Sequence, residues 1–178
     1  MAVDNRAASG GVQKSKYTTK FASLENFDKG GVELINDDPR HYAFSNVFEV
    51  ASKSKPWEKV AVGKNMEYVL EVVRAEGESE WRIAAHDEFA VCLDGAITVE
   101  LVKPATESVP ESQKGSTALT SAPEGQLMGR IQLGRGHQAL LPAQCAYRFT
   151  SETPGVLLMQ TIEGADTQYR WAQICQTV

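Results

Sequence analysis

The feature that most constrains the fold of this chain is a series of short, largely apolar segments separated by glycine, proline and Asp-Gly turns. They occupy residues 59–62, 66–74, 80–101, 128–133, 137–141, 146–150 and 156–162. Short alternating segments bounded by turn residues, with little helical periodicity, are typical of β-sandwiches and barrels. We therefore expect an all-β domain with a few short peripheral helices.

Two connections are expected to be hairpin turns. Asp94-Gly95 joins the two strands of 80–101, and both residues of this dipeptide can take the positive φ of a tight turn. Gly63-Lys64-Asn65 is expected to join 59–62 to 66–74. In 66–74 one strand face is mixed and the other is fully apolar; the apolar face carries Met66, Tyr68, Leu70 and Val72.

Two short helices and one further turn complete the expected elements. Apolar residues at i, i+3, i+4 and i+7 predict a helix over 44–52 that ends by Pro56. A second helix is expected to begin at Asp166, as its N-cap, and to run to Gln176. Thr153-Pro154-Gly155 is expected to be a turn that separates two strands.

The length of 178 residues suits one domain with a well-buried core. Residues 1–25 form a polar arm, which we expect to be flexible; the alternative is an arm that wraps a partner subunit. Residues 26–178 are expected to form a single domain with an insertion at 103–126 that is rich in proline and serine. We favour a flexible hairpin tip for this insertion over a substrate lid.

Charge and composition exclude several classes of partner. The net charge of -5, the isoelectric point near 5.3 and the lack of a Lys/Arg cluster argue against a nucleic-acid partner. The sequence has no signal peptide and no apolar span of membrane length, so we expect no membrane partner. Three unevenly spaced cysteines in apolar surroundings indicate buried thiols in a reducing compartment, and we expect a cytoplasmic protein.

Two motifs in this chain resemble those of the cupin superfamily, whose fold is a double-stranded jelly roll. In the first motif Glu88 is followed by six residues and Gly95, the spacing of the cupin carboxylate and its glycine. In the second, Gly136 and Pro142 are correctly spaced, but Tyr147 replaces the last histidine. Gln144 also stands where the motif has glycine, so the scaffold is recognisable although the second motif is incomplete.

The histidine ligands of the cupin motifs are missing. The first two fall on Trp81 or Arg82 and on Ile83 or Ala84, and His86 has the wrong spacing for either one. A first-row metal in this fold needs two or three imidazoles together with a carboxylate. We therefore expect no metal ligands and no catalytic residues in this chain.

The residues at or near the vacated ligand positions form a candidate pocket of Trp81, His86, Glu88 and Tyr147. If His86 and Glu88 lie on one strand, they point to the same face and could supply acid–base capacity. The alternative is that they hydrogen-bond to each other or to the backbone and fill the vacated cavity. The two aromatic residues either fill the core or line a pocket for a flat ligand.

Four long runs extend the resemblance beyond the superfamily. They are HYAFSNVFEVASKSKPWEKVAVGKNMEYVLEVVRAEG, WRIAAHDEFAVCLDG, MGRIQLGRGHQALLPAQCAYRF and PGVLLMQTIEGADTQYRWAQICQT. They resemble the small subunit of the two-component hydroquinone 1,2-dioxygenases. The resemblance covers most of the chain from about residue 27 to residue 177.

This resemblance implies that the chain is the metal-free small subunit of an Fe(II)-dependent, ring-cleaving dioxygenase. The larger cupin subunit would bind the iron, and the complex would convert hydroquinone to 4-hydroxymuconic semialdehyde in 4-nitrophenol degradation. The resemblance also implies a heterotetramer with two copies of each chain. Two alternatives stay open: a stand-alone cupin with metal-free, isomerase-like activity, and a cupin that binds a small aromatic ligand.

Overall fold

The computed structural model describes residues 21–31, 33–37, 45–106 and 108–171. Within these ranges the chain forms nine strands and one short helix, α1 (Val47–Ser52), which confirms the predicted all-β class. None of the helical residues in these ranges belongs to a helix long and apolar enough to cross a membrane. The strands are β1 (Lys59–Asn65), β2 (Tyr68–Glu78), β3 (Arg82–Ala84), β4 (Glu88–Asp94), β5 (Ile97–Pro104), β6 (Ser116–Ala118), β7 (Gly125–Leu133), β8 (Gln138–Leu141) and β9 (Ala146–Ile162).

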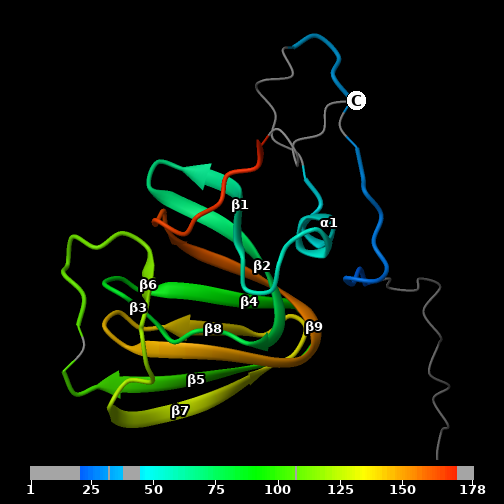
Figure 1. Ribbon diagram of the computed structural model, residues 1–178. Helices are drawn as coiled ribbons and strands as arrows, with labels where there is room; N and C mark the ends of the chain where they lie inside the picture. Colours follow the sequence, from blue (N-terminus) through cyan, green and yellow to red (C-terminus); the bar gives the residue numbers. More distant parts are fainter. Residues whose placement is uncertain (1–20, 32, 38–44, 107, 172–178) are drawn as a thin grey trace, which may run out of the picture.

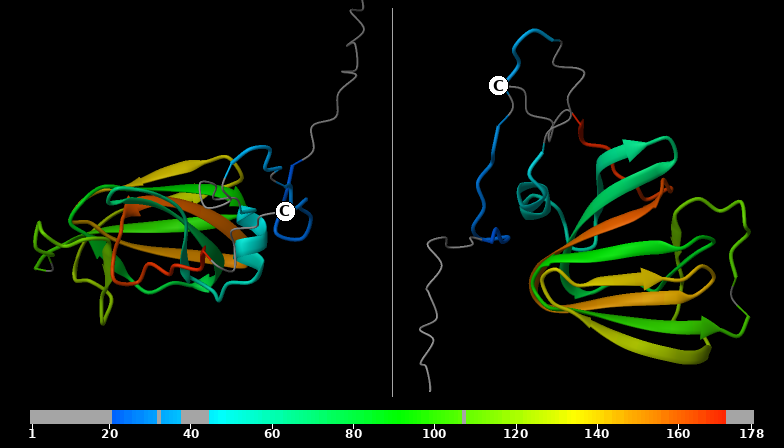
Figure 2. Two further views of the ribbon diagram at one scale, coloured as in Figure 1. Left: turned by 90° about the horizontal axis from the view of Figure 1, so that it is seen from above. Right: turned by 180° about the vertical axis from the view of Figure 1, so that it is seen from behind.

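The long strand β9 organises the sheet, because it takes part in two layers (Figure 1). Its second half, 156–162, pairs with β2 and β4, and β1 and β8 extend this first layer at its two edges. Its first half, 146–151, pairs with β3 and β5, and β6 and β7 extend this second layer. All these pairs are antiparallel. The sheet therefore curls over on itself at the bend of β9, as Figure 2 shows from two further sides.

Two of the predicted connections are wrong in what they join, because the layers share strands. Thr153-Pro154-Gly155 is a bend within β9 and does not end the strand. Asp94-Gly95 is a turn, but β4 and β5 do not pair with each other across it: β4 pairs with β8 and β9, and β5 pairs with β7 and β9. The turn carries the chain from the first layer to the second.

These two corners pack against each other through glycine. Gly95 has a φ of 84°, and a Cβ atom added there would lie 2.9 Å from the Cα atom of Gly155. A Cβ atom added at Gly155 would lie 2.7 Å from the carbonyl oxygen of Asp94. Neither separation is possible for a real side chain, so close contact between the corners requires glycine on both sides.

The β1–β2 hairpin is present, but its turn falls later than predicted. Asn65 pairs with Tyr68, so the turn residues are Met66 and Glu67, and Met66 takes a φ of 57°. Gly63 and Lys64 lie within β1, where the register shifts at Gly63. The positive φ at Met66 allows a tight connection without glycine.

The orientation of β2 leaves apolar side chains exposed on the surface. Its mixed face, with Val69, Glu71 and Val73, points into the core. At the start of the strand, the face predicted to be fully apolar points outward, so that Tyr68 is 57% exposed and Leu70 is 42% exposed.

Three apolar clusters lie among the described residues, and the two larger ones hold the layers and the helix together. The larger lies between the layers and includes buried residues of β2, β4, β5, β8 and β9. The smaller lies on the outer face of the first layer, where α1 covers Val60, Val72 and Val156. The Asn46 side chain caps α1 by accepting hydrogen bonds from the backbone N–H groups of Phe48 and Glu49. This confirms a helix in the predicted region, and its end at Ser52 agrees with the predicted end.

The predicted insertion at 103–126 contributes ordered structure, including β6, which pairs with β3. The residues after Asp166 are not helical up to Arg170; Gln168 instead bridges Val60, so an N-cap at Asp166 is wrong. Trp171 is helical. Residues 172–176 of the predicted C-terminal helix and residues 1–20 of the predicted arm lie outside the described residues.

Two of the cysteines are described. Cys92 and Cys145 are buried free thiols, as predicted, and burial raises the pKa of each. Cys175 lies outside the described residues.

Candidate functional site

The interior of the barrel holds a buried carboxylate, Glu88, whose two oxygens both accept hydrogen bonds. Glu88 begins β4 and has no solvent exposure. The Tyr147 hydroxyl donates to Oε2 over 2.6 Å, and the Thr161 hydroxyl donates to Oε1 over 2.5 Å. Tyr147 and Thr161 lie in the two halves of β9, so the bent strand brings one donor from each layer to the same carboxylate.

His86 joins this group indirectly. It lies in the bend before β4, so the premise that His86 and Glu88 share one strand is wrong. Its Nε2 atom lies 3.1 Å from Thr161 Oγ1 and accepts from the backbone N–H of Ile162 over 3.3 Å. Its Nδ1 atom is buried and has no hydrogen-bond partner among the described residues. Thr161 therefore stands between the imidazole and the carboxylate.

Trp81 lies apart from the other three candidates. It packs with Val102 and Ala146 in a small separate cluster, and the Arg148 guanidinium lies 4.8 Å from the centre of its ring. The structure thus brings together His86, Glu88 and Tyr147 and places Trp81 elsewhere.

Two cations that the sequence analysis did not single out, Lys59 and Arg82, reach the same interior. Lys59 Nζ donates to Ser116 Oγ over 2.6 Å and lies 3.9 Å from Oε2 of Glu71. Arg82 Nε donates to the same Ser116 oxygen over 2.9 Å. The other carboxylate oxygen of Glu71 accepts from the Thr167 hydroxyl over 2.6 Å. Ser116 belongs to β6, so the predicted insertion supplies the acceptor for both cations.

Burial governs the electrostatics of this interior. Burial lowers the pKa of Lys59, and the Glu88 carboxylate is the charge that most opposes this shift. Burial also raises the pKa of Glu71. Burial, together with the neighbouring Glu88 charge, raises the pKa of the Tyr147 phenol well above its ordinary value. Tyr147 therefore keeps its proton and remains a donor to Glu88.

This arrangement does not fit a first-row metal ion. Among the described residues, no group of three or more His, Cys, Asp or Glu side chains is placed to hold a metal. Both oxygens of Glu88 are engaged by hydroxyl donors, and the buried Lys59 ammonium is one of the positive charges that act in this interior. A bound cation would have to displace the hydroxyl donors and lie near a like charge.

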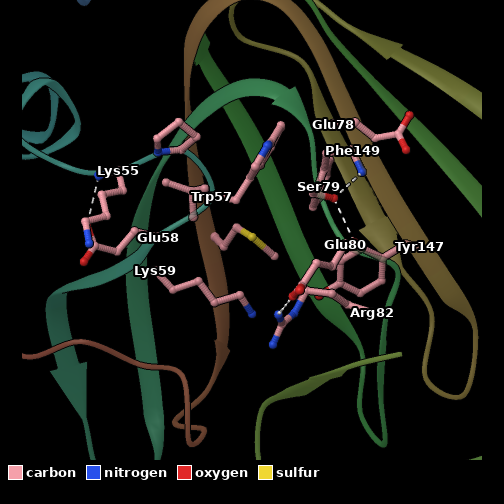
Figure 3. Close-up of a pocket in the computed structure, with 13 residues that line it drawn as sticks. Lys55, Trp57, Glu58, Lys59, Glu78, Ser79, Glu80, Arg82, Tyr147 and Phe149 are labelled. Carbon is pink, nitrogen blue, oxygen red and sulfur yellow. Dashed lines mark hydrogen bonds and ion pairs between the residues drawn. The ribbon is translucent and has the colours of Figure 1, made fainter. Parts of the chain in front are cut away.

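A cavity of about 340 Å³ extends from this cluster toward the surface. Figure 3 shows the head groups of Lys59 and Arg82 converging at one end of the cavity, on the side of Tyr147. At the other end the Trp57 ring stacks on Phe149, with ring centres 6.0 Å apart. The cavity combines aromatic walls with an end where Lys59 and Arg82 lie beside carboxylates: Arg82 pairs with Glu80 and Asp166, and Lys59 lies near Glu71. This combination suits a flat ligand that carries a polar group.

Trp57 has two unusual features in this cavity. Its φ of 61° is uncommon for a bulky residue, and its indole nitrogen is buried without a hydrogen-bond partner among the described residues. Its backbone N–H donates to the Arg74 carbonyl over 2.9 Å, which fixes the loop between α1 and β1 against β2.

Part of this site could have been found from the sequence. Glu71 lies on the same strand face as Val69 and Val73. Had the sequence analysis taken this face of β2 as the buried one, it would have predicted Glu71 to lie inside the barrel. Lys59 and Arg82 offered no comparable pattern, because their shared acceptor, Ser116, is distant in the sequence and comes from a segment without apolar periodicity.

Comparison with solved structures gives two close matches. A hydroquinone 1,2-dioxygenase chain from Sphingomonas sp. TTNP3, in a structure with 4-hydroxybenzoate bound, is 53% identical with a TM-score of 0.87. The match covers 90% of this chain and 98% of that chain. A chain of hydroquinone 1,2-dioxygenase PnpCD, in complex with Cd²⁺ and 4-hydroxybenzonitrile, is 51% identical with the same TM-score; the match covers 93% of this chain and 100% of that chain.

A third match shows the fold alone. Another PnpCD structure, in complex with Fe³⁺, contains a longer chain that is 14% identical with a TM-score of 0.58. The match covers 78% of this chain but 37% of that chain. PnpCD therefore contains a chain of nearly this length and a longer chain with a similar barrel.

No protein-family model and no curated protein sequence matches the chain. The structural matches at more than half identity nevertheless extend over almost the whole chain and confirm the cupin barrel predicted from the two motifs. The chain belongs to the family of hydroquinone 1,2-dioxygenase subunits with a cupin fold.

Proposed function

We propose that this chain is the metal-free small subunit of an Fe(II)-dependent dioxygenase that cleaves hydroquinone to 4-hydroxymuconic semialdehyde. The longer cupin subunit holds the iron, and this chain stabilises it and helps to shape its substrate pocket. The two chains form a heterotetramer with two copies of each. The family supports this proposal, since relatives in it bind Cd²⁺ or Fe³⁺ and include a second, longer cupin chain.

The observation that carries the proposal is the state of Glu88. It occupies the position of the cupin carboxylate, yet both of its oxygens accept short hydrogen bonds from Tyr147 and Thr161. Iron that activates O₂ needs open coordination positions beside its protein ligands. A carboxylate committed to two hydroxyl donors inside a barrel that also contains Lys59 does not provide them, so the proposal assigns the iron to the other chain.

The test is reconstitution from separate subunits. We expect ring cleavage of hydroquinone, followed by ultraviolet absorbance and mass spectrometry of the product, only when this chain and the longer subunit are mixed with Fe(II). Metal analysis of the separated subunits should find iron with the longer chain alone. Native mass spectrometry gives the stoichiometry. Iron retained by this chain alone, or ring cleavage by it alone, would refute the proposal.

The cavity favours a second candidate function, the binding of a small aromatic ligand by this chain. Its aromatic walls and the Lys59 and Arg82 head groups are the specific observation. Titration of the isolated chain with 4-hydroxybenzoate, followed by Trp fluorescence and calorimetry, tests it. Saturable binding that is lost in Lys59→Met, at a pH and temperature where circular dichroism shows this variant to be folded, and kept in Lys64→Met would support this function. Heat and fluorescence changes no larger than those of buffer would exclude it.

A further inference from the structure

The outer face of the first layer is apolar over an area that the chain itself leaves open. Three of its side chains, Tyr68, Leu70 and Leu140, are 57%, 42% and 44% exposed. Two adjacent depressions of about 270 Å³ each hollow this surface, and both are lined by Leu70 and Gln160. We call it the open apolar face; its apolar members are Tyr68, Leu70, Phe89, Val91, Leu140 and Leu158.

The open apolar face continues a surface that is already covered. On the same side of the first layer, α1 and Leu24 pack over Val60, Val72 and Val156. Leu158 belongs to that covered cluster and also lines one of the open depressions. The chain's own cover therefore stops in the middle of one apolar surface, as Figure 1 shows for α1, which lies beside β1 and β2 and away from β8.

Part of the outer surface of the second layer is of the opposite kind, although Leu127 and Met128 on β7 are also exposed there. Glu100 on β5 pairs with Arg130 on β7 and with Arg148 on β9, and Arg148 also pairs with Glu78. This lattice of ion pairs suits contact with water. In contrast, Lys64 is the one charged residue among the described residues that line the two depressions of the open apolar face. It lies at the rim and is paired with Glu163. Exposed apolar patches without charge mark interaction sites.

We propose that the open apolar face is the surface on which this chain docks the longer cupin subunit of the dioxygenase. This inference rests on the proposed function for the existence of that partner. The partner is chosen because PnpCD contains both a close relative of this chain and a longer chain with a similar barrel. The face supplies the apolar core of the interface, and the rim around Lys64 and Glu163 supplies its polar edge.

The experiment compares two double variants of the full chain in binding to the longer subunit. Leu70→Lys with Leu140→Lys places two charges on the open apolar face. The matched control, Leu127→Lys with Met128→Lys, places two charges on β7, where both side chains are 48% exposed. We expect the dissociation constant to rise roughly 100-fold or more for the face variant and less than about threefold for the control.

Folding is checked by circular dichroism and by the midpoint of thermal unfolding. If the face variant does not fold, Gln138→Lys with Gln160→Lys replaces it, because these polar side chains of the same face are already exposed. The same weakening of the complex is expected from this pair.

Three outcomes would overturn the inference, and they separate it from the proposed function. If the wild-type chain does not bind the longer subunit, both fail. If the wild type binds and the folded face variant binds equally well, or the control is weakened as much, the docking surface is wrong while the proposed function stands. If sedimentation shows that the face variant loses only self-association of this chain, the face joins two copies of it and the inference is likewise wrong.

Discussion

At the scale of single residues, the interior of this cupin barrel holds a hydrogen-bonded network around the positions of the motif residues. Tyr147 stands at the position of the motif histidine and donates to Glu88, which stands at the position of the motif carboxylate. Lys59 supplies a positive charge that acts on Glu88 and lies 3.9 Å from Glu71. Hydrogen bonds from hydroxyl groups and the nearby Lys59 side chain thus compensate the burial of both carboxylates.

The Tyr147 hydroxyl is expected to contribute to stability mainly through its hydrogen bond to Glu88. Tyr147→Phe keeps the ring and its edge contact with Phe149 but removes a donor to a buried carboxylate, so the free energy of unfolding should fall by about 2 kcal/mol. Urea denaturation measures this change. Tyr68→Phe, at a 57% exposed position, is the control and should change it by less than about 0.5 kcal/mol. Equal effects in the two variants would contradict the role of the hydroxyl.

Removing Lys59 is expected to have a pH-dependent effect. The pKa of Glu71 is raised in the folded chain, so its contribution to stability is complete below the unfolded value near 4.5 and is lost as the pH rises through the folded pKa. Lys59 opposes that rise, so Lys59→Met raises the pKa of Glu71 further and enlarges the loss. We expect a destabilisation of about 3 kcal/mol at pH 8 and a clearly smaller one near pH 4.5.

Thermal unfolding across this pH range measures the effect of Lys59→Met. Lys64→Met is the control, since Lys64 pairs with Glu163 at the surface. A destabilisation by Lys59→Met that is the same at both pH values would show that Lys59 acts through packing and not through its charge.

At the scale of elements, the bent strand β9 and the short strand β6 decide the site. β9 places Tyr147 and Thr161 on one carboxylate although fourteen positions separate them, since its two halves belong to facing layers. β6 pairs with β3 and brings Ser116 to Lys59 and Arg82. A segment that the sequence marks as a variable insertion therefore closes the polar end of the barrel.

Ser116 is expected to hold this segment in place. Ser116→Ala removes the oxygen that accepts from Lys59 and Arg82, leaving the buried ammonium without this acceptor. Amide hydrogen exchange over 108–124 should accelerate by roughly tenfold or more. Thr117→Ala, at the exposed neighbouring position of the same strand, is the control and should leave the exchange rate nearly unchanged. Equal exchange in the two variants would mean that strand pairing alone holds the segment.

At the scale of the whole molecule, the two layers differ in their outer surfaces. The second layer carries ion pairs between Glu100, Arg130 and Arg148, whereas part of the first layer presents apolar side chains to solvent. An outer face whose exposed side chains are apolar and uncharged is suited to assembly.

The complex with the longer subunit is expected to be insensitive to salt. An interface centred on the open apolar face buries apolar side chains, so screening of charges should matter little. We expect the dissociation constant to change by less than about threefold between roughly 50 and 500 mM NaCl. Calorimetry or surface plasmon resonance measures it, with the free chain at each salt concentration as the reference for folding. A steep weakening with salt would place ion pairs, and hence another surface, at the interface.

The sequence was sufficient for the fold class and the family because both depend on local patterns. Short alternating strands predicted the β fold, and the spacings from Glu88 to Gly95 and from Gly136 to Tyr147 predicted the cupin barrel. The same spacings showed that the motif histidines are absent. These features can be read from neighbouring residues, since strand periodicity and motif spacing involve only short separations along the chain.

Only the tertiary structure decided which strands pair, which face of β2 is buried, and which charges share the interior. Asp94-Gly95 joins two layers and not two paired strands, and Thr153–Gly155 bends a strand that continues. Ser116 on β6 comes to Lys59 and Glu71, which lie on the paired strands β1 and β2. A turn has the same local sequence whether the strands that it joins pair with each other or enter different layers. A buried charge depends on partners that folding brings beside it. Contacts between residues far apart in the sequence therefore determined both the strand pairing and the charged interior.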